Sequence, residues 1–396
     1  MACAHGWGRV SGKVLILGGR APAALDHARR FRKQGWQVHV ADSIPCRLSA
    51  WSAAVSATHA LRPPRHDPRG FVDDLDRIVR GQGIDLVLPT CEEAFHLARH
   101  RQRLPAGVRV AVDAFESLRA LHSKWAFVGL ARRHGLPVPE TARVQGLEEA
   151  RDWAAGRGVV LKPEYSRFGV HVRLYPQGIP ADAPPLAPLG AWVVQAFTHG
   201  DELCSYGIAD RGRLLAHALY RPAYRIHRSS SYYFDPVQRP AIRDAISAFV
   251  AAIGYTGQLS FDWIEAADGS ALALECNPRA TSGLHLFPFD AALPAALLGE
   301  GALLEPVQPR AKMIAALMTS AGLQSALGSG RLGRWHDDWR RADDVAAVRG
   351  DRLPAAGALA DMASFARIAW RGRCSLREAS TRDIEWDGEA LEALDA

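Results

Sequence analysis

One stretch decides how the middle of this chain folds: Leu259-Ser-Phe-Asp-Trp-Ile-Glu-Ala-Ala-Asp-Gly-Ser-Ala-Leu-Ala-Leu-Glu-Cys-Asn-Pro-Arg279. Asp268-Gly269 is a two-residue hairpin turn signal between two apolar runs. A turn at that step pairs Asp262 with Glu275, and it places Asn277 on the same face because side chains alternate along a strand. The opposite face then holds the side chains of Phe261, Trp263, Leu272, Leu274 and Cys276.

The facing carboxylates of Asp262 and Glu275 have two interpretations. Like charges opposed across a hairpin destabilise it, and a divalent cation would remove that repulsion. Carboxylate and amide oxygens suit Mg²⁺, with Mn²⁺ as an alternative. The other interpretation is a solvated acidic face on an antiparallel sheet, since surface carboxylates are common. The hairpin taken alone leaves both open.

The composition is that of an ordinary globular protein. Its 396 residues are too many for one small core and predict two or three domains. Hydrophobic residues make up 48% and charged residues 23%, so no disordered region is expected. The net charge of +6 is not concentrated in a Lys/Arg block interleaved with aromatics, which argues against a nucleic-acid partner. Mild basicity instead suits small anionic substrates such as nucleotides.

Cysteine usage and hydropathy predict a cytoplasmic protein without a membrane partner. The six cysteines are scattered, with no CxxC motif, and are expected to be reduced thiols rather than disulfides or zinc ligands. No signal-peptide core and no apolar run of about 18 residues is visible. Residues 1–12 are expected to form a flexible tail.

Strands alternate with helices in the first third of the chain. Residues 13–17, 38–41, 85–89 and 108–112 are predicted strands, and 23–34 and 92–101 are predicted helices. This alternation predicts a parallel sheet with helices on both faces, whose ligands lie beyond the carboxyl ends of the strands. The polar or small residues that follow strand ends are Gly19, Arg20, Asp42, Thr90, Glu92 and Glu93.

A dinucleotide-binding site, and with it an oxidoreductase, is the first alternative for such a sheet. The segment Gly18-Gly19-Arg20-Ala21-Pro22 is not GxGxxG, and a proline stands where the helix should open onto a pyrophosphate. We therefore expect a tight turn at Gly18-Gly19 and a polar strand end at Asp42.

The next segment carries two lysines and a polar loop. Ser123-Lys124-Trp125 opens a predicted helix that ends at residue 134. Residues 159–163 form a predicted strand that ends at Lys162-Pro163, and a second strand over 170–174 completes a small hairpin. The hairpin tip offers donors that suit a polyphosphate, at Ser166, Arg167 and Gly169. Taken alone, a lysine at a strand end such as Lys162 is more often a surface lysine, and the loop is an ordinary turn.

Antiparallel strands and a long helix follow. A strand over 192–197 leads through a turn at 199–201 to a second strand beginning near Glu202, and residues 214–220 extend the meander. Residues 235–254 are a predicted helix, which the hairpin described first then follows.

The order of these motifs resembles the ATP-grasp superfamily, which includes D-alanine–D-alanine ligase, biotin carboxylase and carbamoyl phosphate synthetase. The resemblance covers about residues 13–310. It implies a Rossmann-like pre-ATP-grasp α/β domain over 13–120 and an α+β ATP-grasp domain over 121–310. The latter would have a small lobe over 121–190 with the phosphate loop and a large lobe over 191–310 with the metal site. Residues 311–396 are left as a small mixed C-terminal domain, which we interpret as a cap over the substrate side.

The resemblance implies roles by position. Lys124 and Lys162 would contact the phosphates of ATP, and Asp262, Glu275 and Asn277 would bind the Mg²⁺ that bridges them. Nucleotide contacts would also come from the backbone of Gln195 and Phe197 to adenine, from Glu202 to the ribose, and from the loop of Ser166, Arg167 and Gly169. Arg279 would stabilise a phosphate or acyl phosphate. Many relatives have a glutamate where this chain has Ala196, but that contact uses the backbone.

No motif identifies the residues that recognise the substrate, but several side chains are candidates. The arginines Arg221, Arg225 and Arg228 could each pair with a substrate carboxylate, or lie solvated on the surface. His285 is either a base or a structural histidine, and Ser282 and Gly283 lie beside it. Cys276 is predicted to be a core thiol.

The motif order predicts an ATP-dependent ligase that joins a small carboxylate and a small amine through an acyl phosphate, with Lys162, Arg225 and Arg279 as catalytic residues. A carboxylase or carbamoyl-phosphate-type enzyme is the nearest alternative. A non-catalytic ATP-binding regulator is the next, and the complete metal and phosphate set disfavours it. Superfamily members often form homodimers, but nothing in this sequence demonstrates one.

Overall fold

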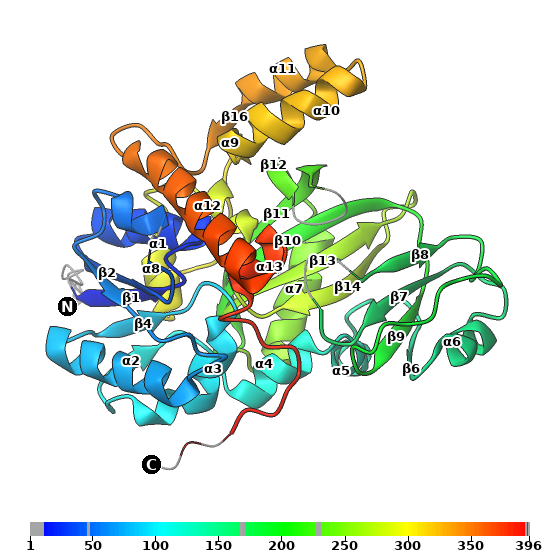
Figure 1. Ribbon diagram of the computed structural model, residues 1–396, viewed down its shortest axis with the longest axis horizontal. Coiled ribbons are helices and arrows are strands. Elements are labelled where there is room, and N and C mark those ends of the chain that lie inside the picture. Colours follow the sequence, from blue (N-terminus) through cyan, green and yellow to red (C-terminus); the bar gives the residue numbers. More distant parts are fainter. Residues whose placement is uncertain are drawn as a thin grey trace, which may run out of the picture.

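The computed structural model describes residues 12–45, 48–166, 169, 171–226, 231–392 and 394, and the strands of these residues form three sheets (Figure 1). The N-terminal sheet is parallel, with the order β3-β2-β1-β4-β5. Its strands are β1 (Lys13–Leu17), β2 (Gln37–Asp42), β3 (Ala57–Ala60), β4 (Leu86–Leu88) and β5 (Arg109–Val110).

Helices cover both faces of this sheet, as predicted. Val14 and Ile16 pack in one core cluster with residues of α1, while Leu15 and Leu17 pack in another with residues of α2 and α3. Because side chains alternate along β1, this one strand contributes residues to two hydrophobic cores. The helical elements here are α1 (Pro22–Lys33), η1 (Leu48–Trp51), α2 (Pro68–Gln82), α3 (Glu93–His100), η2 (Arg101–Arg103) and α4 (Phe115–His122).

A small antiparallel sheet follows, with the order β6-β9-β7-β8. The predicted hairpin is present as β7 and β8, and Ala150 and Ala154 of α6 pack against Trp192 and Val194 of β9. The elements are α5 (Lys124–Arg133), β6 (Thr141–Val144), α6 (Leu147–Ala154), β7 (Val159–Pro163), β8 (Arg173–Tyr175) and β9 (Trp192–Ala196).

The large sheet has the order β14-β13-β10-β11-β12-β15-β16. Residues 235–237, predicted to be helical, belong instead to β12, and the helix α7 begins at Pro240. The aromatic run Tyr232–Phe234 favours the strand, and a proline suits the first helical turn. The elements are β10 (Asp201–Asp210), β11 (Arg213–Arg225), β12 (Ser231–Val237), α7 (Pro240–Ile253), β13 (Gly257–Glu265), β14 (Ala271–Asn277), η3 (Ser282–Leu286) and α8 (Leu293–Leu297).

The β13–β14 hairpin has the predicted pair but a different turn. Asp262 lies opposite Glu275, as expected. The loop, however, is closed by the Ala266 amide, which donates to the Ser270 oxygen at 2.8 Å, so it is longer than a two-residue turn. A register shift after Asp262 compensates for that difference. As a result Ala273 is buried beside Trp263, and the predicted core residues Leu272 and Leu274 are only partly buried.

The C-terminal region is mixed and returns to the N-terminal sheet. Its strands β15 (Ala311–Met313) and β16 (Ala342–Asp344) complete the large sheet. The longest helix, α12, packs against η1, where Gly357 lies against the Trp51 ring. The helices are α9 (Ala315–Leu317), the π-helix η4 (Met318–Gly322), α10 (Leu323–Gly328), α11 (Leu332–Arg341), α12 (Leu353–Gly372) and α13 (Leu376–Thr381).

Candidate functional site

Two partly buried carboxylates face each other on the large sheet. Asp262 of β13 and Glu275 of β14 are direct cross-strand partners, so their side chains leave the same face. Burial raises the pKa of Asp262, and the Glu275 charge raises it further, to about 7. Burial also acts to raise the pKa of Glu275, but Lys124 and Lys162 outweigh it and lower that pKa. The sheet therefore holds a concentrated negative charge beside two ammonium groups.

The two lysines come from different elements and are both buried. Lys124 begins α5, and its Nζ lies 3.8 Å from Glu275 Oε2 and donates to the Ser166 carbonyl oxygen at 3.0 Å. Lys162 lies in β7, where burial lowers the pKa of its ammonium group and the nearby Glu275 opposes that shift. Two cations held this close together suit a polyanion better than a single carboxylate.

The side chain of Gln195 is engaged within the protein. Lys162 Nζ donates to Gln195 Oε1 at 2.9 Å, and Gln195 Nε2 donates to Thr141 Oγ1 at 3.2 Å. Any nucleotide contact at this position would therefore use the backbone, as expected. The Phe197 amide donates to the Gly158 oxygen at 3.0 Å, so a contact at Phe197 would be restricted to its carbonyl oxygen.

The start of α5 is held by Ser123 and by Glu164, a residue that the sequence analysis did not assign to the site. Ser123 caps the helix by accepting from the Ala126 amide at 3.0 Å, and its hydroxyl donates to Glu164 Oε1 at 2.5 Å. The Lys124 amide donates to the Glu164 carbonyl oxygen at 3.2 Å. The sequence predicted that a helix begins at Ser123, but it could not predict the hydrogen bond from Ser123 to Glu164, 41 residues away.

Arg279 lies between the hairpin and the N-terminal sheet. Its Nη2 donates to Asn277 Oδ1 at 3.4 Å, and its Nε is 3.5 Å from Oε1 of the buried Glu92. Glu92 follows the end of β4 and directly precedes α3. The carboxyl edge of the parallel sheet and the acidic hairpin of the large sheet thus meet at one guanidinium group.

Two of the three candidate substrate arginines are paired with acids. Arg225 forms an ion pair with Glu202, and Arg221 Nη2 is 3.2 Å from Asp201 Oδ2. Arg225 thus lies beside the predicted ribose contact rather than in a separate substrate pocket. Arg167 and Arg228 lie outside the described residues. Of the loop residues, Gly169 has a φ of +61°, a conformation that favours glycine.

His285 has a structural environment. Its Nδ1 is 2.9 Å from Asp26 Oδ2 of α1, and its ring stacks on Phe234. Arg30 completes this group by pairing with Asp26 and donating to the carbonyl oxygen of Phe287 at 2.8 Å. These contacts favour the structural interpretation of His285 over its interpretation as a base. Neighbouring Gly283 has a packing role, because a Cβ there would lie 2.6 Å from Tyr206 Cβ.

A thiol completes the row of side chains across the sheet. Cys204 of β10 is the cross-strand partner of both Asp262 and Tyr220. Burial raises the pKa of the Cys204 thiol well above its ordinary value, and the Asp262 charge raises it further, so the thiol stays protonated. Cys276 lies in the core, as predicted, with 2% of its surface exposed.

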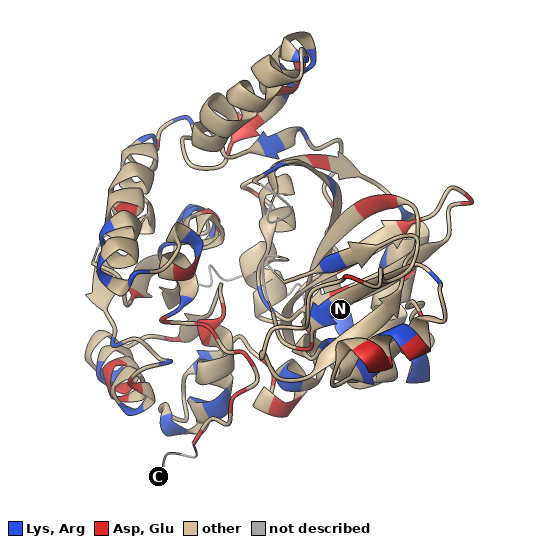
Figure 2. Ribbon diagram, turned by 45° about the vertical axis from the view of Figure 1, so that its right-hand side comes forward, with Lys and Arg blue, Asp and Glu red and all other residues tan. Residues whose placement is uncertain are grey.

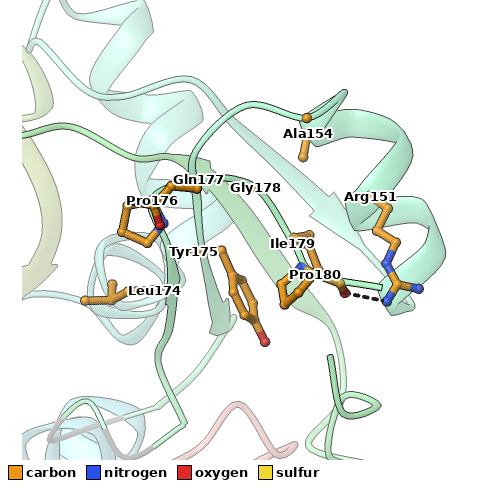
Figure 3. Close-up of a pocket in the computed structure, with 10 residues that line it drawn as sticks. Arg151, Ala154, Leu174, Tyr175, Pro176, Gln177, Gly178, Ile179 and Pro180 are labelled. Carbon is orange, nitrogen blue, oxygen red and sulfur yellow. Dashed lines mark hydrogen bonds between the residues drawn. The ribbon is translucent and has the colours of Figure 1, made fainter. Parts of the chain in front are cut away.

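One cavity lies away from these residues. It has a volume of about 520 Å³ and lies at the edge of the small sheet, where Arg151 of α6 donates to the Pro180 oxygen (Figure 3). Its wall is formed by the segment from Leu174 to Pro180 together with Arg151, Ala154 and Gly156. None of the predicted site residues lines it.

Charges are interspersed over the described ribbon, and acidic and basic residues often share a helix (Figure 2). Arg77 and Arg80 pair with acids one turn earlier on α2, for example. Within the described residues, no helix is long and apolar enough to cross a membrane.

The residues present fit a divalent cation that is shared with a bound phosphate. Over the part of the chain that the structure describes, no three His, Cys, Asp or Glu side chains lie close enough together to hold a metal. The candidate set is instead two carboxylates and one amide, at Asp262, Glu275 and Asn277. Magnesium is often held by one or two carboxylates plus substrate phosphates. Burial and then the Glu275 charge raise the pKa of Asp262, and a bound cation would oppose both effects.

Comparisons with known proteins identify the fold. No protein-family model and no curated protein sequence matches the chain. Solved structures do match, among them N5-carboxyaminoimidazole synthetase from Staphylococcus aureus, with a TM-score of 0.59 and 13% identity over 76% of this chain and 81% of that one. L-amino acid ligase from Bacillus licheniformis matches with a TM-score of 0.55 and 15% identity, over 72% of this chain and 74% of that one.

A third match is the biotin carboxylase domain dimer of 2-oxoglutarate carboxylase from Hydrogenobacter thermophilus, in complex with MgADP, ADP and bicarbonate. Its TM-score is 0.57 and its identity 14%, over 73% of this chain and 70% of that one. Identities this low establish the fold alone. The chain has an ATP-grasp-like α/β architecture: a parallel N-terminal sheet, a small antiparallel sheet and a large mixed sheet.

Proposed function

We propose that this protein is an ATP-dependent carboxylate–amine ligase, which forms an amide or peptide bond through an acyl phosphate and releases ADP and phosphate. The observation that carries the proposal is the pairing of Asp262 with Glu275 directly beside the buried Lys124 and Lys162, on an ATP-grasp-like fold. This arrangement concentrates both signs of charge where Mg²⁺ and a triphosphate would need them.

In this proposal the small and large sheets hold the nucleotide between them. Lys124 and Lys162 neutralise phosphate oxygens, Glu202 holds the ribose, and the backbone of β9 around Gln195 contacts the base. Asp262, Glu275 and Asn277 would hold Mg²⁺, which screens the phosphate charge when bound. Ser166 and Gly169 belong to the loop that would cover the phosphates. Phosphoryl transfer requires positioning and charge neutralisation more than covalent help, and these residues supply both.

The proposed reaction has two balanced steps. A substrate carboxylate oxygen attacks the γ-phosphorus of ATP, the bond to the bridging oxygen breaks, and ADP leaves. A substrate amine nitrogen then attacks the acyl carbon, the carbon–oxygen bond to phosphate breaks, and the amine loses a proton to give the amide. Arg279, between Asn277 and Glu92, would stabilise the negative charge on the acyl phosphate.

A carboxylating enzyme is the second candidate, because two of the matched structures carry carboxylation in their names and one contains bicarbonate. Bicarbonate would then be the acid that receives the phosphoryl group. The same residues would serve, so the site alone does not separate the two candidates. Incorporation of label from isotopic bicarbonate into product would favour carboxylation.

The deciding experiment incubates the purified protein with MgATP and pools of amino acids, polyamines and small carboxylic acids. Phosphate release and product masses are measured together. We expect a new mass equal to acid plus amine minus water, with one ADP per product. Binding of ATP without phosphate release from any pool would instead favour a regulator. Failure to bind ATP would overturn the proposal.

A further inference from the structure

The last segment of the chain returns to the N-terminal sheet and is fixed there by ion pairs. We call residues 382–391 the C-terminal strap. Arg20 Nη1, at the carboxyl end of β1, is 2.7 Å from Asp383 Oδ1. Arg65 Nη1 is 2.5 Å from Glu385 Oε1, and its Nη2 is 3.0 Å from Asp387 Oδ2. The strap therefore has a defined path over this sheet.

Trp386 anchors the strap in an aromatic cluster. Only 1% of its surface is exposed, and its indole Nε1 donates to the Glu389 carbonyl oxygen at 2.7 Å. Its ring centroid lies 5.1 Å from Phe95, 5.3 Å from Phe115 and 5.2 Å from Tyr165. Phe95 and Phe115 belong to the N-terminal domain, whereas Tyr165 follows β7 of the small sheet. Trp386 thus joins two parts of the molecule.

The strap touches Tyr165 a second time at Gly388. This glycine has a φ of +92°, and a Cβ at this position would lie 2.4 Å from Tyr165 Cδ2. The backbone can approach the ring this closely only because the residue is glycine. Two strap residues therefore fix the position of one aromatic ring.

Tyr165 lies between two residues that hold Lys124. The preceding Glu164 accepts from the Ser123 hydroxyl at 2.5 Å and from the Lys124 amide at 3.2 Å. The following Ser166 accepts from Lys124 Nζ at 3.0 Å through its carbonyl oxygen. A displacement of Tyr165 would therefore move both the backbone and the side-chain partner of a lysine assigned to phosphate binding.

We propose that Trp386 is a positioning residue for the nucleotide site, and that the C-terminal strap sets the segment 164–166, and through it Lys124, in place for phosphate binding. This inference rests on the proposed function for its effect on nucleotide affinity. It assigns to the C-terminal strap a role at the segment 164–166, from which it is separated by more than 200 residues of sequence.

The test compares Trp386→Ala and Trp386→Phe with the wild-type protein. Calorimetric titration with MgADP gives the dissociation constant, and hydrogen exchange gives the protection of residues 159–166 in the free protein. We expect Trp386→Ala to weaken MgADP binding about tenfold, as a small displacement of a binding group does, and to speed exchange in 159–166. Trp386→Phe keeps an aromatic ring in the cluster and should recover most of both properties.

Trp370→Ala is the matched control, because Trp370 lies in the same C-terminal region but is 81% exposed on α12. It should change neither measurement. If Trp386→Ala does not fold, Gly388→Ala makes the same test by pushing on the Tyr165 ring. A folded variant with wild-type MgADP affinity and wild-type exchange in 159–166 would overturn the inference. Absence of MgADP binding by the wild type would instead refute the proposed function, and the exchange measurement would still decide the positioning role.

Discussion

Two acidic residues, Asp26 and Asp262, have pKa values that are shifted in opposite directions. Asp26 is 3% exposed and is paired with Arg30 and His285. Burial acts to raise the pKa of Asp26, but these two partners outweigh it and hold the pKa well below its ordinary value. Asp262 is also shielded from water, yet its cross-strand partner is another carboxylate, and its pKa is raised.

The difference separates a structural charge from a functional one. The Asp26 group satisfies its charge inside the protein, and Arg30 continues the network to the carbonyl oxygens after η3. The Asp262 group leaves a repulsion between carboxylates that a ligand could relieve. Acids whose pKa is perturbed by burial and by a like charge are the ones expected at functional sites. The comparison therefore favours the β13–β14 hairpin over the Asp26–His285 group as the functional site.

The largest effect is expected from Glu275→Gln. Removing this carboxylate should lower ATP-dependent phosphate release at least ~10³-fold, because several kcal/mol of transition-state charge stabilisation is lost. The unfolding free energy should change little, since loss of the like-charge contact with Asp262 offsets loss of the attraction to Lys124 and Lys162. Phosphate release and chemical denaturation measure the two properties. Glu300→Gln, at an exposed position, is the control. Undiminished phosphate release would refute the site assignment.

The opposite pattern is expected from Asp26→Asn. This change leaves the fully buried Arg30 without its carboxylate partner, and such losses typically cost about 3–5 kcal/mol of unfolding free energy. Protein that remains folded should keep its nucleotide affinity, because Asp26 does not contact the carboxylate pair. Urea denaturation and MgADP titration at a temperature well below unfolding make the test. A stable variant would show that Asp26 is not the structural charge that the comparison requires.

Comparison of the wild type with Asp26→Asn also predicts how the unfolding free energy depends on pH. The folded-state pKa of Asp26 is depressed below its ordinary 3.8, so its stabilising contribution is fully present above that value and is lost as the pH falls through the lower folded-state pKa. The difference in unfolding free energy between wild type and Asp26→Asn should therefore be constant near neutrality and shrink below about pH 4. Taking the difference cancels the titration of other acids. A difference that grows on acidification would contradict the assigned ion pairs.

His285 gives a smaller effect that sharpens the comparison. His285→Leu removes the partner of Asp26 Oδ2 and should cost about 1–3 kcal/mol of unfolding free energy. His285→Asn can place an amide donor near the position of Nδ1 and should cost less. Both variants should keep the phosphate release of the wild type when folded. A general base would behave differently, because its removal lowers the rate about 10²–10⁴-fold in either variant.

Local signals predicted much of the fold. β1 and β7 have the predicted bounds, and Asp262 and Glu275 are paired as the hairpin signal indicated. The same signal misplaced the turn, and the pair was still correct only because a register shift after Asp262 offsets the longer loop. Such a shift depends on which of Ala273 and Leu274 packs against the core, which the alternation of apolar residues in β14 does not reveal.

Contacts between residues far apart in the chain could not be predicted from the sequence. His285 and Asp26 are 259 residues apart, and no local sequence pattern around either residue indicates that they are in contact. The contact of Trp386 with Tyr165 joins the end of the chain to the small sheet, and only the folded topology brings them together. Likewise residues 235–237 at the end of β12 were predicted to begin a helix, because the partner strands β11 and β15 lie outside the sequence window in which periodicity is read.

The smallest effect is the most direct test of the comparison, and it is expected from Asp262→Asn. Most substitutions of partly buried polar residues destabilise a protein, but this one removes a charge that faces Glu275 and keeps the shape of the side chain. The metal-free protein should therefore be stabilised by up to about 1 kcal/mol, the scale of a cross-strand charge pair. Thermal unfolding in the presence of a chelator measures the effect, and Asp26→Asn under the same conditions supplies the opposite sign. A destabilised Asp262→Asn would mean that Lys124 and Lys162 already neutralise the pair, and that the hairpin holds its own charges without a ligand.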